Sequence, residues 1–112
     1  MPTTAIAKGA SPITLINVFT VKPEDQDKLV TMLNEATEKT MRNQPGFVSA
    51  NIHKSLDGLR VANYAQWRTK QDFEAMLKNA EATAHMQAIG KIATFDAHVY
   101  AVSEVHAGPA RT

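Results

Sequence analysis

The segment from Arg60 to Trp67, with the sequence RVANYAQW, has the alternating pattern of a half-buried β-strand. Successive side chains of a strand point to opposite faces, so this pattern divides the segment into two sets. One face carries Leu59, Val61, Asn63, Ala65 and Trp67. The other carries Arg60, Ala62, Tyr64 and Gln66. The first face is apolar except for Asn63, which predicts a core strand that buries one amide.

Asn63 and Trp67 are the chemically distinctive residues of this face. A buried amide without hydrogen-bond partners costs about 1–3 kcal/mol. Trp67 is the only tryptophan in the chain, and it combines a large apolar ring with one N–H donor. Val61 and Ala65 are slim enough for a planar molecule to lie over the strand. The residues alone leave two interpretations open: a core tryptophan beside an internally satisfied amide, or a pair that binds a planar ligand.

The composition is that of an ordinary globular domain, with 44% hydrophobic and 21% charged residues among 112. The net charge of +1 gives no electrostatic reason to expect nucleic acid or an anionic membrane as a partner. The chain has no cysteine, which excludes disulfides, thiolate nucleophiles and cysteine-bound metals. No apolar run approaches the roughly 20 residues of a membrane span, and no signal-peptide core is visible. We therefore expect a cytoplasmic protein.

The first half of the chain predicts a strand, a helix and a second strand. Residues 13–21 alternate, and Asn17 is the one polar member of the face formed by Ile13, Leu15, Asn17, Phe19 and Val21. Pro23 opens a helix with an apolar stripe, which ends near Asn43. In the second strand, residues 47–55, one face carries Val48, Ala50 and Ile52, and the other carries Phe47, Ser49, Asn51 and His53.

The second half predicts a helix in two pieces and a long last strand. Thr69 caps the first piece, and Asn79-Ala80 breaks it. The second piece covers residues 81–89, and Gly90 ends it as a C′ glycine, a position that usually takes left-handed backbone. The last strand covers residues 92–105, with Ala93, Phe95, Ala97, Val99 and Ala101 on one face.

The order of elements is β-α-β-β-α-β, and an Asp57-Gly58 turn joins the second and third strands into a hairpin. Right-handed crossovers then give an α+β, ferredoxin-like split fold with sheet order 4-1-3-2. We expect one domain over residues 13–105, a flexible arm over residues 1–12 and a tail over residues 106–112. The first and third strands are then neighbours, so that their two asparagines can both face the helices.

Most familiar catalytic motifs are missing. The four histidines, His53, His85, His98 and His106, show neither an H-x-x-x-H pair nor the spacing of a facial triad, so we predict no metal. No G-x-S-x-G motif supports a serine hydrolase. No glycine-rich phosphate loop offers a cradle for flavin or nicotinamide, so we predict no cofactor.

What remains is a dry pocket with aromatic, amide and thioether walls. Small-molecule sites are mostly apolar, with a few polar groups that orient the ligand. The candidate residues of this pocket are Asn17, Phe19, Asn63, Trp67, Phe73, Met76 and Met86. His85 is a candidate base if it faces the pocket, and its alternative role is that of a capped or solvent-facing helical histidine.

The sequence NYAQW, preceded by PGFVSANIHKSLDG, resembles the antibiotic biosynthesis monooxygenase family. The similarity is specific from Pro45 to Phe73 and looser from Ile13 to Val105. The nearest members are the small cofactor-independent monooxygenases that oxidise aromatic polyketides to quinones. The resemblance implies that Asn63 and Trp67 line the active site and are catalytic.

This resemblance implies an oxidation in which the substrate itself supplies the electrons. An electron-rich phenol or anthrone loses a proton, and its anion reacts with O₂. The protein then has to orient the substrate and stabilise the developing anion by hydrogen bonds. The Asn63 amide and the Trp67 N–H are donors of that kind.

Two positions depart from the patterns of the resembled proteins. Phe73 stands where the polyketide-oxidising relatives tend to have tyrosine, so no phenol acts at this position. A haem-degrading branch uses an asparagine on the first strand, which Asn17 matches, and an axial histidine, near which His85 lies. Met76 stands where that branch has a helical tryptophan. This substitution counts against haem degradation, which stays as one alternative; a non-catalytic barrel that binds a hydrophobic metabolite is another.

Two helices cover only one face of a four-stranded sheet, so the other face exposes apolar side chains that favour association. The resembled family solves this by packing two sheets into a dimeric α+β barrel. The last strand of 14 predicted residues is also longer than the usual 3–10 or so. We therefore expect a homodimer in which the end of this strand reaches the partner subunit.

Overall fold

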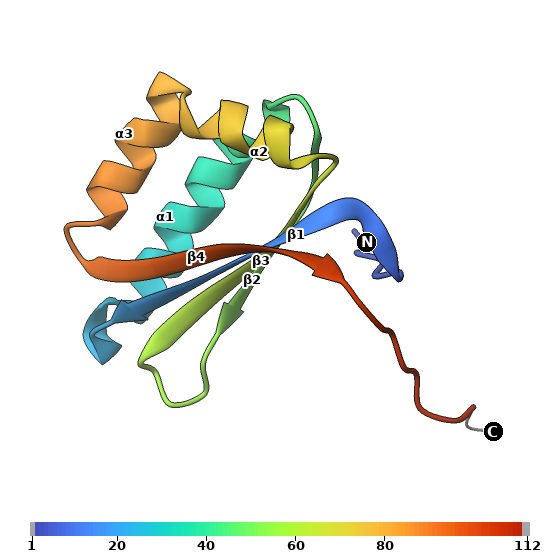
Figure 1. Cartoon of the computed structure of the whole chain (residues 1–112). Coiled ribbons are helices and arrows are strands. Elements are labelled where there is room, and N and C mark those ends of the chain that lie inside the picture. Colours follow the sequence, from blue (N-terminus) through green and yellow to red (C-terminus); the bar gives the residue numbers. More distant parts are fainter. Residues whose placement is uncertain (1, 111–112) are drawn as a thin grey trace.

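The computed structural model describes residues 2–110, which contain a four-stranded sheet and three α-helices (Figure 1). The strands are β1 (Gly9–Val21), β2 (Phe47–Lys54), β3 (Arg60–Trp67) and β4 (Ala93–Val102). The α-helices are α1 (Gln26–Lys39), α2 (Lys70–Leu77) and α3 (Ala80–Ile89). Short 3₁₀ turns flank α1, at η1 (Pro23–Asp25) and η2 (Met41–Asn43).

The four strands form an antiparallel sheet in the order β2-β3-β1-β4, and the three helices cover one face of it (Figure 1). This is the predicted split α+β architecture, read from the other edge of the sheet, so the predicted fold and strand order are confirmed. The central pair β1 and β3 brings Asn17 opposite Asn63. Within residues 2–110, no helix has both the length and the apolarity needed to cross a bilayer.

The start of β1 and the end of β4 differ from the predicted strand boundaries. β1 begins at Gly9, four residues before the predicted start, and its pairing with β4 shifts register between Gly9 and Thr14. β4 ends at Val102, three residues before the predicted end. The chain from 103 to 110 is exposed and runs away from the domain (Figure 1). Met1 and residues 111–112, which belong to the predicted arm and tail, lie outside the described residues.

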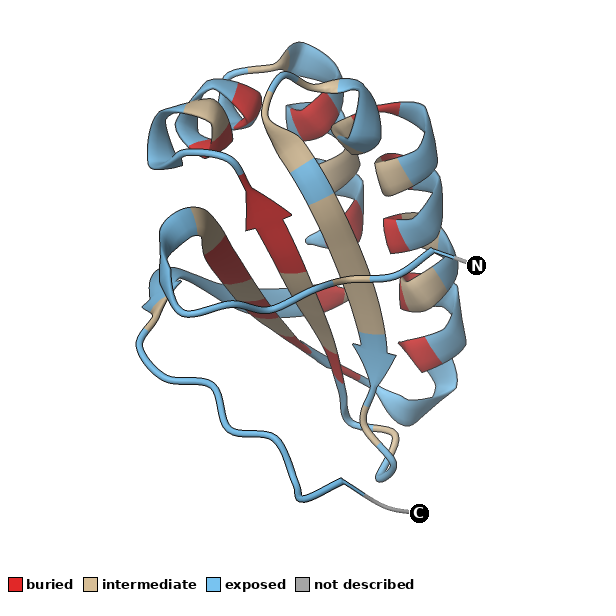
Figure 2. Ribbon diagram, turned by 90° about the vertical axis from the view of Figure 1, so that its right-hand side faces the viewer, coloured by how far each residue is buried: buried red, intermediate tan, exposed pale blue. Residues whose placement is uncertain are grey.

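The described part of the N-terminal arm lies on the helix-free face of the sheet, where it crosses β2 (Figure 2). Thr4 Oγ1 donates to Asn51 Oδ1 at 2.7 Å, and Gln66 Nε2 donates to the Ala5 carbonyl oxygen at 2.8 Å. Gln66 is only 3% exposed beneath it. The arm therefore covers one part of this face and leaves the rest uncovered.

Side-chain caps explain where α2 and α3 begin. The Thr69 hydroxyl accepts from the Asp72 N–H at 3.0 Å, as the sequence predicted. Asn79 Oδ1 accepts from the Ala82 N–H at 3.0 Å, which starts α3 at the predicted break. Gly90 follows the end of α3 as predicted, but it is the C-cap residue with a helical φ of −61° and ψ of −13°, and not a left-handed C′ glycine. The end of α3 tightens into turns instead, so no left-handed residue is required.

A β-bulge in β2 overturns the predicted face of Phe47. The β2–β3 register moves from Phe47 opposite Trp67 to Ser49 opposite Gln66, so one extra residue, Val48, interrupts the alternation. Phe47 therefore lies on the helix side with Ala50, and not with Ser49 as strict alternation predicts. Its ring packs edge-on against that of Trp67, with 5.6 Å between centroids.

The β2–β3 hairpin turns at the predicted Asp57-Gly58, where Gly58 has a φ of +82°. Asp57 Oδ1 accepts from the Leu59 N–H at 3.0 Å and from the Ser55 hydroxyl at 2.7 Å. The backbone N–H of Leu59 and then the Ser55 hydroxyl hold the pKa of Asp57 below its ordinary value. Leu59 precedes β3 and is 43% exposed, so its predicted place in the core was wrong.

The core between the sheet and the helices consists of two clusters of buried residues. The first contains Phe19, Val21, Leu29, Leu33, Val61, Ile89 and Ala93. The second contains Leu15, Ala65, Trp67, Phe73, Met76 and Ala82. On β1, Asn17 lies between Leu15 of the second cluster and Phe19 of the first. On β3, Asn63 lies between the two clusters in the same way, so the two amides mark the boundary in the core.

Candidate active site

A cavity of about 370 Å³ lies between the helix-facing side of the sheet and the three helices. Every strand and every α-helix contributes to its wall, together with Met41 from η2. The sheet side is lined by Leu15, Asn17, Phe19, Phe47, Ala50, Asn63, Ala65, Trp67, Phe95 and Ala97. The helix side is lined by Leu33, Ala36, Thr37, Met41, Phe73, Met76, Leu77, Ala82, Thr83, Met86 and Gln87. The cavity therefore occupies the boundary between the two core clusters.

Small side chains of the sheet leave room for this cavity. In the row that crosses the sheet through the two asparagines, β4 contributes Ala97. In the next row, Ala50 and Ala65 are paired across β2 and β3. Larger residues at these positions would fill the space, so the alanines leave a shallow floor on which a flat molecule can lie.

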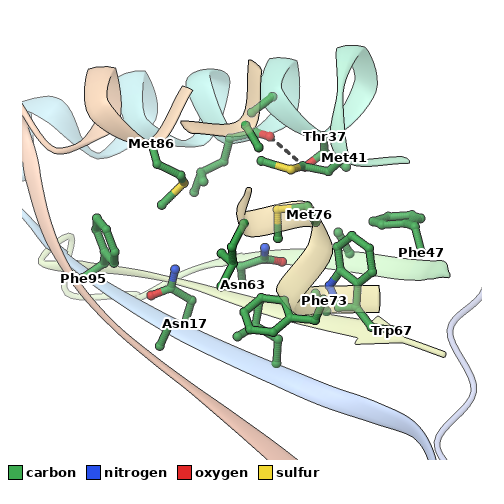
Figure 3. A pocket seen from close by; sticks show the side chains of 18 of the residues that line it. Asn17, Thr37, Met41, Phe47, Asn63, Trp67, Phe73, Met76, Met86 and Phe95 are labelled. Carbon is green, nitrogen blue, oxygen red and sulfur yellow. Dashed lines mark hydrogen bonds between the residues drawn. The ribbon is translucent and has the colours of Figure 1, made fainter. Parts of the chain in front are cut away.

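Asn17 and Asn63 form the polar part of this floor. They are direct partners in the antiparallel pairing of β1 with β3, and both side chains point toward the helices (Figure 3). Their Oδ1 atoms are buried and have no hydrogen-bond partner among the described residues. A carbonyl oxygen in this position costs about 1–3 kcal/mol unless a donor reaches it. The two amides are therefore free to hold a ligand.

Trp67 closes one end of the cavity between two phenylalanines (Figure 3). It is 2% exposed, and the centroids of Phe47 and Phe73 lie 5.6 Å and 6.1 Å from its own. Its Nε1 is buried and also lacks a partner within residues 2–110. Since the indole N–H only donates, a ligand must present an acceptor to satisfy it.

The remaining apolar candidates lie where the sequence placed them. Phe19, Phe73, Met76 and Met86 all line the cavity, and the two methionines reach it from α2 and α3 (Figure 3). Phe73 is 8% exposed and carries no hydroxyl, so no phenol stands beside Trp67 on this side.

His85 is the one predicted site residue that does not line the cavity. Its Nε2 lies 3.0 Å from the hydroxyl of Thr40, which also donates to Glu81 Oε2 at 3.0 Å. A hydroxyl has one proton to donate. Because the Thr40 hydroxyl donates to Glu81, its oxygen accepts a hydrogen bond from the His85 Nε2–H. His85 therefore joins α3 to the end of α1, and its candidacy as a base facing the pocket is not supported.

Sequence reasoning missed several lining residues. Phe47 was missed because the bulge in β2 reverses its face. Met41 lies in a short turn after α1, beyond the apolar stripe that marked the helix. Phe95 was on the correct face of its strand, and its pairing with Phe19 across β1 and β4 could have indicated its place. Its ring lies 5.6 Å from that of Phe19.

The lining carries no ionisable side chain among the described residues: its polar members are asparagine, glutamine, threonine and the tryptophan N–H. The Thr37 hydroxyl is already used, since it donates to the Leu33 carbonyl oxygen at 2.8 Å. No group of three or more histidine, aspartate or glutamate side chains with metal-site geometry occurs within residues 2–110. The site can therefore bind and orient an apolar ligand, and it offers neutral donors and acceptors.

The mouth of the cavity lies at the edge strand β4. Phe95 is 46% exposed, and Leu77 on the facing helix α2 is 53% exposed, although both line the cavity. Ala97, Thr83 and Gln87 are also exposed lining residues of β4 and α3. A ligand can thus enter between β4 and the helices without unfolding the core.

The sequence and the structure both match known proteins. The family model described as antibiotic biosynthesis monooxygenase matches residues 12–88. The tetracenomycin-F1 monooxygenase of Streptomyces glaucescens is 50% identical over 80 residues, which cover 71% of each chain.

Two solved structures share the fold. A monooxygenase from the ActVA-Orf6 gene of Streptomyces coelicolor, in complex with the ligand nanaomycin D, has 25% identity and a TM-score of 0.77. This match covers 89% of the present chain and 95% of the other. SnoaB, a cofactor-independent oxygenase from Streptomyces nogalater, has 22% identity and a TM-score of 0.72. This match covers 86% of the present chain and 97% of SnoaB. The predicted resemblance is confirmed: the chain belongs to the antibiotic biosynthesis monooxygenase family.

Proposed function

We propose that this protein is a cofactor-independent monooxygenase that oxidises an electron-rich aromatic phenol or anthrone of polyketide type to a quinone with O₂. The relative that is 50% identical acts, by its name, on a polyketide-type compound, tetracenomycin F1. The cavity supports the same class of substrate, because it is apolar, flat-floored and within the roughly 300–1,000 Å³ of small-molecule sites.

The observation that carries the proposal is the set of three unpartnered polar atoms in this apolar cavity: Asn17 Oδ1, Asn63 Oδ1 and Trp67 Nε1. A hydroxylated polycycle supplies what they lack. Its hydroxyl groups donate to the amide oxygens, and its carbonyl or phenolate oxygen accepts from the indole N–H. Binding such a ligand offsets the cost of leaving these atoms buried without partners.

In this reaction the methylene carbon of an anthrone loses a proton, and the resulting anion transfers electrons to O₂ as a C–O bond forms. The O–O bond of the resulting hydroperoxide then breaks as the second C–H proton leaves. The products are a ketone and water, so one oxygen atom of O₂ enters the quinone. Trp67 N–H and the amides stabilise the anion by hydrogen bonds and hold its ring in place.

The lining offers no carboxylate, imidazole, amine or phenol among the described residues to take the first proton. The proton therefore passes to solvent, and the acidity of the substrate decides how much anion forms. A series of ring-substituted anthrones of different acidity tests this point. The apparent pKa of kcat/KM should move with the pKa of the substrate, whereas a protein base would hold it constant.

Of the two alternative functions, haem degradation loses support in the site. Haem degradation needs an axial histidine in the cavity, and His85 is directed to Thr40 instead. A binding protein without turnover would use the same cavity and differs only in the outcome of the assay below. We also propose that the protein is cytoplasmic and that it acts as a homodimer through the helix-free face of the sheet.

The deciding experiment follows O₂ uptake with anthrone as substrate, with ¹⁸O₂ supplied in place of air. We expect uptake that depends on the protein and one labelled oxygen atom in the anthraquinone produced. A sample without protein corrects for spontaneous oxidation. Tight binding of anthrone with no added uptake would identify a binding protein, and a Soret band on haem titration would favour the haem alternative.

A further inference from the structure

Three thioether groups surround the space in which the proposed chemistry takes place. The chain has five methionines, and Met41, Met76 and Met86 all line the cavity. They come from η2, α2 and α3, and they lie above the floor that carries the asparagine amides (Figure 3). The chain has no cysteine, so these sulfur atoms and the indole of Trp67 are the easily oxidised groups of the lining.

We propose that the cavity methionines intercept organic hydroperoxides and so protect Trp67 from oxidation. This inference rests on the proposed function for its natural oxidant, since oxidation of an aromatic anion by O₂ passes through an organic hydroperoxide. A hydroperoxide that does not collapse to product is held against the thioethers. Met76 is only 7% exposed to solvent, so oxidation of this methionine would have to come from an oxidant inside the cavity.

The reaction balances without another component. The thioether sulfur attacks the distal oxygen of the hydroperoxide, the O–O bond breaks and an S–O bond forms, and the proton of the distal oxygen passes to the departing alkoxide oxygen. The hydroperoxide is reduced to an alcohol, and the methionine is oxidised by two electrons to its sulfoxide, a change that reductases reverse. Oxidation of an indole ring has no such repair, so a methionine sulfoxide is the lesser damage to the site.

The chain supplies its own matched control. Met32 lies on α1, is half-buried and packs against the first core cluster, but it does not line the cavity. Trypsin cleaves after lysine and arginine and therefore places the four residues on separate peptides. These peptides are residues 29–39 for Met32, 40–42 for Met41, 71–78 for Met76 and 79–91 for Met86. The mass of one added oxygen can thus be assigned to each methionine.

The test uses cumene hydroperoxide, an apolar aromatic oxidant of a size that the cavity admits, with hydrogen peroxide as the polar comparison. We expect cumene hydroperoxide to oxidise Met76 and Met86 about tenfold faster than Met32, because oxidation follows access to the oxidant. Naphthalene, which is not oxidised under these conditions, should abolish the difference by filling the cavity. Equal rates at all four methionines, or rates ordered by solvent exposure alone, would overturn the proposal.

A second measurement separates protection from packing. In the triple variant M41L/M76L/M86L the thioethers are gone while side-chain volume is kept, so cumene hydroperoxide should destroy the fluorescence of Trp67 several-fold faster than in wild type. The variant M32L should behave as wild type. Unchanged loss of Trp67 fluorescence in a folded triple variant would contradict a protective role.

The same experiment distinguishes failure of this inference from failure of the proposed function. Selective oxidation of the cavity methionines without O₂ uptake on anthrone would retain the inference for external hydroperoxides and remove the proposed activity. O₂ uptake on anthrone without selective oxidation of these methionines would retain the activity and remove the inference.

Discussion

Asn17 and Asn63 are paired directly across the two central strands, and both of their amide oxygens are buried without a partner. Two adjacent asparagines on an apolar sheet face could satisfy one another, yet neither side chain does so. Each lies between the two hydrophobic clusters, at the level of the cavity. The pair is therefore available to a ligand, and without one its unpartnered oxygens lower the stability of the folded state.

The first prediction concerns Asn63 and Trp67. Asn63→Ala and Trp67→Phe should each lower turnover of anthrone by about 10²–10³, the usual effect of losing one donor in a water-poor site. Trp67→Phe should cost about 1–2 kcal/mol of unfolding free energy, because most of the ring area remains. Asn63→Ala should leave stability unchanged or raise it, since its Oδ1 is already unpartnered. O₂ uptake and thermal melting of the same samples measure both effects.

Asn34→Ala is the matched control for that pair, because Asn34 is an exposed asparagine on α1 outside the cavity. It should retain wild-type turnover. Full activity of both cavity variants in the folded state would contradict a functional role for this strand, and loss of stability in place of rate would show that the residues are structural.

The second prediction concerns His85, whose hydrogen bond to Thr40 lies outside the cavity. His85→Ala should lower the free energy of unfolding by about 1 kcal/mol, the typical worth of one such bond. Thr40→Val should lower it by at least as much, since it removes the hydroxyl that hydrogen-bonds to both His85 and Glu81. Chemical denaturation measures the stability, and turnover should stay within about twofold of wild type because neither side chain reaches the substrate. A large loss of turnover in folded His85→Ala would restore this residue as a catalytic base.

The third prediction concerns association of the sheet faces. On the helix-free face of the sheet, the N-terminal arm covers Gln66. A shallow hollow on the same face is lined by Ile16, Tyr64 and Tyr100, and Tyr100 is 46% exposed. We expect a homodimer by light scattering, because this apolar surface needs a partner. Ile16→Glu places a charge at its centre and should give monomers. Leu56→Glu, at the fully exposed tip of the hairpin, should leave the dimer intact. A monomeric wild type would refute the barrel.

The fourth prediction concerns the pH dependence of the β2–β3 hairpin. The pKa of Asp57 is lowered in the folded protein, first by the Leu59 N–H and then by the Ser55 hydroxyl. A lowered pKa means that this carboxylate stabilises the fold above its ordinary pKa of 3.8 and loses that effect as the pH falls through the lowered value. Asp57→Asn should therefore melt below wild type at pH 7, and the difference should vanish in acid.

Glu24→Gln is the control for that titration, because Glu24 is an exposed carboxylate in the short turn before α1. Its melting temperature should follow wild type throughout the acid range. A difference between Asp57→Asn and wild type that stays constant with pH would show that the hydrogen bonds of the hairpin do not depend on the charge of Asp57.

The sequence by itself determined the order of the elements and the polar residues on the sheet side of the cavity. Alternation of apolar residues in β1 and β3 is a local property, and it was enough to place Asn17, Asn63 and Trp67 on one face. The predicted cap at Thr69 and the predicted break at Asn79 are likewise local, because each side chain accepts from a backbone N–H three positions along the chain. Strand order then followed from the handedness of the crossovers.

Only the tertiary structure decided which of these residues share one cavity. The bulge that turns Phe47 toward Trp67 arises from pairing between two strands, and no periodicity within β2 reveals it. His85 is on the same helix as Met86, yet Thr40, 45 residues away in sequence, holds it outside the cavity. Contacts between distant segments fix strand register and side-chain direction. Both depend on packing and hydrogen bonds with residues that are far away in the sequence.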